Sequence, residues 1–420
     1  MYSFITTFNL VVFLLFTIFY FYQIVYTIVA LFSKSKAFVA EKNHKYGVII
    51  AARNERAVIA NLIASIRQQD YPEELVDIFV IADNCTDDTA EVAREAGATV
   101  FVRNNTELVG KGYALDYAFH RLHTEYADRG YEGYFIFDAD NLLERDYIKE
   151  MNTVFDAGYL MVTSYRNSKN YDSNWISAGS SLWFLREARY LNNARMILGT
   201  SCAVSGTGFL VHDSVIRKNG GWKYHLLTED IEFSVDNAIS GGMIGYCDSA
   251  RLYDEQPVLF SQSWRQRLRW AKGFYQVFVN YGGDLVKTAL TKRSFSCYDM
   301  FMTVSPAMFI SLLSIVMNLV FLVIGLFNVT TMPRMIPYTL LAAIMSVVNF
   351  YLVLYIFGLL TTITEWKQIH APTYKKILYT FTFPIFIFTY VPISIVALFR
   401  KIEWKPIQHS VAKTIEDIHE

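Results

Sequence analysis

Four long runs of apolar residues stand out along the chain, at residues 5–32, 302–327, 337–360 and 377–399. A helix rises about 1.5 Å per residue, so roughly 20 residues cross the ~30 Å hydrocarbon core of a bilayer. Each run is long enough, and a buried helix of a soluble protein is seldom apolar on every face over such a length. The pattern predicts four membrane-spanning helices, one before and three after a long polar stretch.

Positive charge is distributed unevenly around the first run. Lys34, Lys36, Lys42 and Lys45 follow it, whereas no Lys or Arg precedes it. Basic residues concentrate on the cytoplasmic side of membrane proteins, so we expect an outside N-terminus and a cytoplasmic polar stretch in a multi-pass cell-membrane protein. A cleaved signal peptide fits less well, because the run is too long for one and no small-residue cleavage site follows.

The polar stretch, residues 45–292, alternates between short apolar runs and amphipathic segments. Its pattern predicts strands at 46–52, 76–82, 100–102 and 134–137, and helices at 55–68, 88–96 and 111–123. Repeated strand–helix units form a mainly parallel sheet with helices on both faces, and ligands bind at the carboxyl ends of its strands. We therefore expect an α/β domain with its site at that edge.

Composition narrows the function classes. The chain has 420 residues, 53% of them hydrophobic, and a net charge of -1, which excludes a disordered chain and gives no basic field for nucleic acid. The cysteines at 85, 202, 247 and 297 are scattered without a zinc-binding spacing. A cytoplasmic domain would keep them reduced, as small buried or partly buried side chains.

Acidic residues follow the predicted strands and open one later helix. Asp138 and Asp140 are two residues apart at a strand end, so their carboxylates project the same way and can hold a hard divalent ion together with a diphosphate. A solvated turn is the alternative. Asp83 follows the second strand, and Thr228-Glu229-Asp230 opens an amphipathic helix, where acidic residues also act simply as caps.

A basic aromatic segment, Gln266-Arg267-Leu268-Arg269-Trp270, precedes the second apolar run. Two arginines and a glutamine can grip a diphosphate, and an indole can stack on a sugar ring. A helix of this composition also suits the lipid–water interface, so position alone does not decide between the two roles.

Taken in order, Asp83, Asp138-x-Asp140, Thr228-Glu229-Asp230 and Gln266-x-x-Arg269-Trp270 resemble the motifs of processive family-2 glycosyltransferases. These include cellulose, hyaluronan, chitin-oligosaccharide and poly-N-acetylglucosamine synthases. The resemblance covers about residues 46–284 and implies a cytoplasmic α/β domain of the GT-A (Rossmann-like) fold, inserted between α-helical transmembrane segments. It divides the chain into an N-terminal transmembrane helix at 1–33, a GT-A domain at 45–260, interfacial helices at 261–296, a C-terminal transmembrane region of about three spans at 300–400 and a short tail at 401–420.

The resemblance also implies roles for single residues. Asp230 would be the general base, and Asp138 and Asp140 would bind Mg²⁺ or Mn²⁺. The nucleotide sugar would be bound by Ala51, Glu55, Asp83, Lys111, Asp138, Gln266 and Arg269. The acceptor would contact Glu229, Trp270, Ser205 and Gly206.

The implied reaction is inverting, processive transfer from a UDP-sugar to a growing β-linked polysaccharide, coupled to membrane translocation. UDP-glucose and a β-glucan are favoured over UDP-N-acetylglucosamine, and the partners are the UDP-sugar, the polysaccharide and the bilayer. One alternative is a non-processive transferase with a lipid acceptor. Another is a transporter or receptor with an enzyme-like domain, which would carry charged or broken residues inside its spans; the apolar runs largely lack them.

One conflict concerns the tail. Three spans after a cytoplasmic domain place the tail outside, whereas Arg400, Lys401 and Lys405 favour the inside. Pro384 and Pro392 can bend the last apolar run so that it does not simply cross. The sequence leaves both possibilities open.

Overall fold

The computed structural model describes residues 2–305, 307–402, 407 and 409–419. An eight-stranded mixed sheet forms the centre of the polar part, in the order β3-β2-β1-β4-β7-β6-β8-β5. Its strands are β1 (Tyr46–Ala52), β2 (Val76–Asp83), β3 (Thr99–Arg103), β4 (Gly133–Asp138), β5 (Leu142–Leu143), β6 (Met161–Ser168), β7 (Phe209–His212) and β8 (Ile244–Asp254).

The two halves of the sheet differ in direction. Strands β1 to β4 pair in parallel, as predicted. The other half is mixed rather than parallel throughout, because β7 is antiparallel to both β4 and β6 and β5 is antiparallel to β8, whereas β6 and β8 pair in parallel. The long helical segment between β6 and β7 does not act as a right-handed crossover, so β7 enters the sheet in the opposite direction.

The register of the parallel half lines up the strand ends. Tyr46 of β1 pairs with Val76 of β2 and with Gly133 of β4. At the other end of β1, Ala51 lies beside Asp138. The carboxyl ends of the three strands therefore meet at one edge, where the polar residues that follow them gather.

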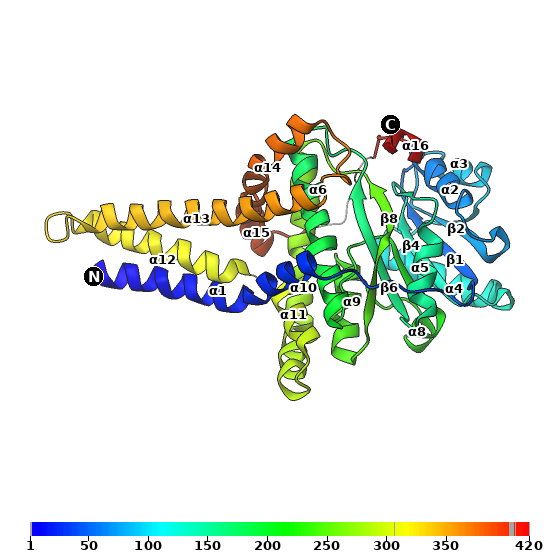
Figure 1. The fold of residues 1–420 in the computed structure, drawn as a ribbon, viewed down its shortest axis with the longest axis horizontal. Coiled ribbons are helices and arrows are strands. Elements are labelled where there is room, and N and C mark those ends of the chain that lie inside the picture. The colour runs from blue at the N-terminus through cyan, green and yellow to red at the C-terminus, as the bar shows by residue number, and fades with distance from the viewer. Residues whose placement is uncertain (1, 306, 403–406, 408, 420) are drawn as a thin grey trace.

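Short helices lie around the sheet (Figure 1). They are α2 (Ile59–Arg67), α3 (Thr89–Glu95), α4 (Lys111–Glu125), α5 (Tyr147–Asp156), α8 (Asp213–Lys218) and α9 (Glu229–Ser240). Leu62 and Ile63 of α2 are fully buried against the strands. The helix predicted from residue 55 begins only at Ile59, because Asn54 has a positive φ and the Glu55 amide donates to Thr89 Oγ1, which holds a turn there.

Helices on the other side of the sheet connect the domain to the apolar part. α6 (Trp175–Arg186), the π-helical η3 (Glu187–Asn192) and α7 (Asn193–Leu198) form one continuous segment. α10 (Phe260–Thr291) and α11 (Phe295–Val304) follow later in the chain. Figure 1 shows these helices between the sheet and the apolar bundle.

Among the residues that the structure describes, three helical stretches are long and apolar enough to cross a membrane: Ser3–Phe32, Met335–Thr364 and Thr373–Phe399. A shorter apolar stretch is Leu313–Phe327. α1 (Tyr2–Phe32), α12 (Ala307–Phe327) and α13 (Met335–Thr364) run side by side away from the domain (Figure 1).

The last apolar run differs from the other three. It is broken at Thr389 into α14 (Thr373–Phe388) and α15 (Tyr390–Phe399), with Pro384 inside α14. In Figure 1 both helices lie across the direction of α13. α14 packs on α6, where a Cβ at Gly179 would meet Phe386 Cβ at 2.7 Å, and Lys272 of α10 donates to the Ala397 carbonyl of α15 at 3.1 Å.

The tail returns to the sheet. Its helix α16 (Ile415–His419) buries Ile415 and Ile418 against Leu142 of β5 and Tyr253 of β8. Tail and domain are therefore in direct contact and lie on the same side of any membrane that the bundle crosses.

Candidate active site

The carboxylates predicted from the strand ends do gather at one edge of the sheet. Glu55 follows β1, Asp83 ends β2, and Asp138 and Asp140 lie at the end of β4. Glu55, Asp83 and Asp140 are buried and Asp138 is half-buried. We call this cluster the donor half of the site.

Two carboxylates of the donor half are paired with cationic side chains. Arg103 Nη1 donates to Asp83 Oδ1 at 2.5 Å, and both residues are buried. The Lys111 ammonium forms an ion pair with Asp138 and donates to the Gly206 carbonyl at 2.6 Å. Lys111 therefore links the donor carboxylates to the loop before β7.

The glycines on either side of Lys111 are needed for its position. Gly110 has a φ of 139°, which side chains rarely adopt. A Cβ at Gly112 would lie 2.1 Å from the Tyr224 carbonyl oxygen, so α4 can approach that loop only with glycine there. These two glycines allow α4 to begin at Lys111, whose side chain reaches Asp138.

His409 of the tail completes the donor half, and the sequence analysis missed it. Its Nδ1 lies 2.9 Å from Glu55 Oε2, and its Nε2 lies 3.9 Å from Asp140 Oδ2. Burial opposes a charge on the ring, but Asp140, Glu55 and Glu255 raise the pKa of His409 to about 10. The side chain is thus a cation between two carboxylates. No local pattern marks it, since it lies 354 residues from Glu55 along the chain.

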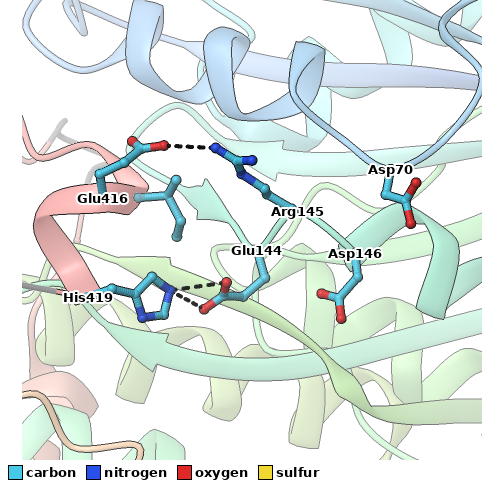
Figure 2. Close-up of a pocket in the computed structure, with 7 residues that line it drawn as sticks. Asp70, Glu144, Arg145, Asp146, Glu416 and His419 are labelled. Carbon is cyan, nitrogen blue, oxygen red and sulfur yellow. Dashed lines mark hydrogen bonds and ion pairs between the residues drawn. The ribbon is translucent and has the colours of Figure 1, made fainter.

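The rest of the tail is fastened to neighbouring loops. The Ser410 and Val411 amides both donate to Glu255 Oε2, at 2.9 and 2.8 Å. Figure 2 shows α16 with Glu416 facing Arg145 and His419 facing Glu144. The residues of these two pairs line an open pocket, and the bonds from Ser410 and Val411 fasten the chain directly after His409.

A second pair of residues behind the donor half was also missed. Arg166 of β6 is ion-paired with Asp254 at the end of β8, and its Nη1 donates to the Ser205 carbonyl at 2.6 Å. The Glu255 amide donates to Asp140 Oδ2 at 2.7 Å. Asp254 and Glu255 could have been found, because they are acidic residues after a strand, as Asp83 and Asp138 are.

The acceptor half of the site, as we call it, contains Glu229 and Asp230 at the start of α9. Glu229 is buried and Asp230 is half-buried. In the described part of the chain, neither carboxylate forms an ion pair. Burial and then the neighbouring Asp230 raise the pKa of Glu229 to about 7, and burial raises the pKa of Asp230. Lys111 and Arg269 oppose both shifts through their charge.

The N-cap residue Thr228 does not cap this helix through its side chain. The Thr228 side chain makes no capping hydrogen bond, and instead packs where a Cβ at Gly273 of α10 would meet it at 2.5 Å. The loop before the helix is held by Glu232, whose Oε2 accepts from the His225 and Leu226 amides at 3.0 Å. Glu229 and Asp230 accept hydrogen bonds from backbone amides of the first turn of α9, and these bonds oppose the rise in the pKa of each carboxyl.

The loop before β7 lies between the two halves. Ser205 Oγ donates to Glu187 Oε1 at 3.0 Å. Gly206 has a φ of 84°, and a Cβ there would be 3.8 Å from Asp230 Oδ2. Both residues expected at the acceptor are thus close to Asp230.

The basic aromatic segment lies on α10. Gln266, Arg269 and Trp270 are half-buried, and Gln266 Oε1 is a buried atom without a hydrogen-bond partner among the described residues. The Trp270 ring packs edge-on against Phe184 at 6.0 Å, and the Arg166 guanidinium lies 3.7 Å from the Phe184 ring centre.

Of the two arginines of this segment, Arg267 is bound to another part of the chain. It is buried, and its Nη1 donates to the Phe386 carbonyl at 3.2 Å and to Thr389 Oγ1 at 2.5 Å. The guanidinium thereby satisfies the backbone at the end of α14, next to the break before α15. Arg269, two residues later, points to a different side of the helix.

The donor half suits a divalent cation held jointly with a nucleotide. Asp138 and Asp140 provide the hard oxygen ligands that Mg²⁺ and Mn²⁺ prefer. Within the described residues, no group of three His, Cys, Asp or Glu side chains is arranged around a common point. Further ligands would have to come from diphosphate oxygens and water, as is usual for Mg²⁺.

Comparison with known proteins gives a family match. Residues 44–273 match the family described as "Glycosyltransferase like family 2". The chain is 25% identical over 267 residues to the β-monoglucosyldiacylglycerol synthase of Nostoc sp., covering 61% of this chain and 54% of that protein. It is 25% identical over 250 residues to the poly-β-1,6-N-acetyl-D-glucosamine synthase of Staphylococcus aureus, covering 58% and 57%. The matches thus span a little over half the length of these two relatives.

A solved structure shares the fold. The mannosyltransferase PcManGT from Pyrobaculum calidifontis, in complex with GDP-Man and Mn²⁺, superimposes with a TM-score of 0.54 at 15% identity. The superposition covers 93% of this chain and 99% of that one. The GT-A fold expected from the sequence is confirmed.

Proposed function

The chain belongs to glycosyltransferase family 2 and is a nucleotide-sugar-dependent glycosyltransferase, and we propose that it transfers a sugar from a UDP-sugar with inversion. The observation that carries the proposal is Asp230, a half-buried carboxylate without an ion pair among the described residues, next to a donor half whose carboxylates are balanced by cations. Such a carboxylate is suited to accept a proton, since a base works best with a pKa raised towards the working pH.

The proposed donor site uses the sheet edge. Asp83 would bind the uridine, with Ala51 and Glu55 lining the same pocket. Asp138 and Asp140 would hold Mg²⁺ or Mn²⁺, whose charge, when bound, stabilises the leaving diphosphate. Lys111, Gln266 and Arg269 would add hydrogen bonds and positive charge to the phosphates.

The proposed reaction is a single displacement. An acceptor hydroxyl oxygen attacks the anomeric carbon of the donor sugar from the face opposite the diphosphate. The new C–O bond forms as the sugar–phosphate bond breaks, and the electron pair of that bond leaves with UDP. Asp230 takes the hydroxyl proton. An α-linked donor thereby gives a β-linked product, and general-base help of this kind contributes roughly 10²–10⁴-fold in rate.

For the acceptor, we propose the end of a growing β-linked polysaccharide, with glucose from UDP-glucose as the favoured unit and with translocation through the membrane region. Support comes from the Gln-x-x-Arg-Trp segment next to Glu229 and Asp230, and from the likeness to a poly-N-acetylglucosamine synthase. Trp270 would stack on the terminal sugar, held by its edge-on contact with Phe184. Ser205, Gly206 and Glu229 would contact the acceptor hydroxyls.

A lipid acceptor is the second candidate, and the apolar bundle favours it. A polymer path needs a polar lining, whereas the exposed faces of α13 are apolar, as at Val347, Leu352 and Val353. Tyr351 donates to the Phe381 carbonyl of α14 at 2.9 Å, and Tyr355 packs on the Phe381 ring, so both serve helix packing. The relative that makes a glucosylated diacylglycerol is consistent with this candidate.

We also propose a membrane arrangement. α1, α12 and α13 cross the bilayer, and α14 and α15 lie at its surface, so the tail returns to the side of the catalytic domain, which is the cytoplasm. This arrangement accounts for the basic residues after α15 and removes the conflict over the tail. It keeps the division into residues 1–33, 45–260, 261–296, 300–400 and 401–420, with two spans and a surface hairpin in the fourth part in place of about three spans.

The deciding experiment uses the purified full-length protein with radiolabelled UDP-glucose and, separately, UDP-N-acetylglucosamine. Products would be split into organic and aqueous phases and then digested with linkage-specific hydrolases. We expect aqueous, high-molecular-weight material that a β-glucanase degrades. Label confined to the organic phase would establish the lipid acceptor, and no label in either phase would contradict a UDP-sugar donor of these two kinds.

A further inference from the structure

A second cavity lies away from the site, where the domain-side end of α13 meets the sheet. It has a volume of about 360 Å³. Its lining includes Tyr165 and the charged residues Arg189, Asp248, Arg251, Glu365 and Lys367. Tyr165 and Arg166 are neighbours on β6 and point to opposite faces of the sheet, so this cavity lies on the face opposite the Arg166–Asp254 pair. We call it the junction cavity.

Positive charge is in excess in the junction cavity. Three cationic side chains line it against two carboxylates, and both carboxylates already accept hydrogen bonds. Tyr165 donates to Glu365 Oε2 at 2.5 Å, and Ser35 and Tyr246 donate to Asp248. Burial also raises the pKa of Glu365, which weakens its negative charge.

The arginines of the junction cavity have hydrogen-bonding capacity to spare. The Nε atoms of Arg189 and Arg251 are buried and donate no hydrogen bond within the described part of the chain. Arg189 lies 3.6 Å from Glu365 and 3.9 Å from Asp248, distances that suit ion pairs but not hydrogen bonds. The Arg251 guanidinium lies over the Tyr165 ring, 5.8 Å from its centre. Buried donors without acceptors are rare in proteins, and each one points to a water, an ion or a ligand.

In the membrane arrangement proposed above, the junction cavity would lie at the level of the membrane surface. Ile363 and Thr364, the last residues of the α13 span, form part of its wall, and Ile363 is exposed. Trp366, which also lines it, is of the residue type that collects at the lipid–water interface. Ser35, which donates to Asp248 at 2.8 Å, lies in the basic segment that follows α1.

We propose that the junction cavity binds a phosphate-bearing anion, with Arg189, Arg251 and Lys367 as its donors. Guanidinium groups bind phosphate oxygens in pairs, and they need acceptors of the kind that Arg189 and Arg251 lack here. Two sources share this chemistry: the headgroup of an anionic phospholipid, and a free phosphate from the cytoplasm. Basic pockets at the cytoplasmic ends of membrane helices suit the first source. The site is separate from the proposed donor and acceptor residues.

The binding test has one arm for each source. In the lipid arm, the full-length protein is reconstituted in nanodiscs of equal parts phosphatidylcholine and phosphatidylglycerol. It is then re-extracted in detergent, and the lipid that stays bound is measured by mass spectrometry. In the phosphate arm, the detergent-purified protein is heated with inorganic phosphate or with chloride at equal ionic strength, and Tm is compared.

Arg251→Gln and Lys367→Gln are the test variants, and Arg94→Gln is the control, because Arg94 is an exposed arginine paired with Glu91 on α3. We expect phosphatidylglycerol to be enriched in the bound fraction, and the enrichment to fall on the order of fivefold in each test variant, the worth of one basic side chain at an anionic surface. Arg94→Gln should match the wild type.

The outcomes separate the sources. Enrichment lost in the test variants identifies a lipid headgroup, and a phosphate-dependent rise in Tm lost in the same variants identifies a free phosphate. No enrichment and no Tm rise would overturn the proposal, as would binding that both test variants retain. Lys367 is exposed, so its replacement leaves the fold intact and keeps the test meaningful if Arg251→Gln is poorly folded.

Discussion

The donor and acceptor halves of the site use carboxylates in opposite ways. In the donor half, Asp83 is bonded to Arg103, Asp138 to Lys111, and Glu55 to His409. In the acceptor half, Glu229 and Asp230 form no ion pair with any residue that the structure describes, and burial raises the pKa of both. The carboxylates of the donor half are paired with cationic side chains, whereas those of the acceptor half are unpaired among the described residues and more basic than usual.

The difference corresponds to two tasks. A nucleotide sugar has two phosphates and binds together with a metal ion. The buried carboxylates of the donor half are stable next to the cationic side chains Arg103, Lys111 and His409, because a buried charge without a partner is costly. A base must take a proton during the reaction, and a carboxylate tied to a guanidinium would have too low a pKa for that. Replacing carboxylates in the two halves should therefore affect different steps.

The largest effect is expected from Asp230→Asn. The amide keeps the size of the side chain but cannot take a proton, so kcat should fall roughly 10²–10⁴-fold. UDP affinity, measured by calorimetry, should stay near the wild-type value because the residue faces the acceptor. Asp236→Asn is the matched control, since Asp236 lies on the same helix and is paired with Lys223 outside the site. Near-normal turnover in Asp230→Asn would remove the base assignment.

The donor half should respond in binding as well as in rate. Asp140→Asn should weaken Mn²⁺-dependent UDP binding by more than the roughly 10–100-fold that loss of an outer-shell partner costs a metal site. EDTA should abolish transfer by the wild type, and Mg²⁺ or Mn²⁺ should restore it. Asp156→Asn, which changes a carboxylate bonded to His44 elsewhere on the domain, should bind UDP normally. Full activity in EDTA would contradict a metal at Asp138 and Asp140.

The sequence predicts more of the donor half than of the elements around it. β1, β2 and β4 are short runs of buried branched and aromatic residues, and their parallel register places the residues that follow at one edge. Local pattern and tertiary structure agree there. β1 was predicted to the residue and β2, β3 and β4 to within one residue at each end, whereas β5 to β8 were not predicted.

The contacts that could not be predicted are long-range. His409 reaches Glu55 across 354 residues, and no periodicity or motif marks it. Arg267 and Arg269 look equivalent in sequence, yet Arg267 is used to hold the end of α14 because the chain breaks at Thr389. The apolar run 377–399 has the length of a span, and only its packing on α6 and α10 shows that it lies across the others. Composition sets how apolar a helix is, whereas its direction depends on what it packs against.

Trp270→Ala tests whether the Trp270 indole contacts the terminal sugar of the acceptor. If the indole holds the terminal sugar near Asp230, its loss should lower transfer on the order of 10²-fold, as a misplacement of about 1 Å can, while UDP affinity changes little. Trp270→Phe should recover part of the rate. Trp264→Ala is the control, because Trp264 lies on the same helix and packs with the α15 cluster instead. Product size by gel filtration gives the second readout: normal length and yield from Trp270→Ala would leave the residue as a membrane-surface anchor.

The smallest effect is expected from Glu229→Gln, and it appears only as a dependence on pH. Burial and Asp230 raise the pKa of Glu229 to about 7, so its carboxyl is neutral below that pH and charged above it. The charge that appears as pH rises lies in the same site as the anionic donor, so KM for the UDP-sugar should increase between pH 6 and pH 8, within about tenfold. Glu229→Gln resembles the neutral form at every pH, and its KM should therefore stay flat over that range.

The kcat of Glu229→Gln should still fall towards acid pH, because Asp230 must lose its proton to act as the base and its own raised pKa is retained. Steady-state KM and kcat, measured at half-unit pH steps, would check both pH dependences. Glu232→Gln is not a suitable control, because Glu232 holds the loop before α9. A KM that rises equally in Glu229→Gln and in the wild type would mean that Glu229 does not titrate near pH 7. The contrast between the paired carboxylates of the donor half and the unpaired ones of the acceptor half would then fail.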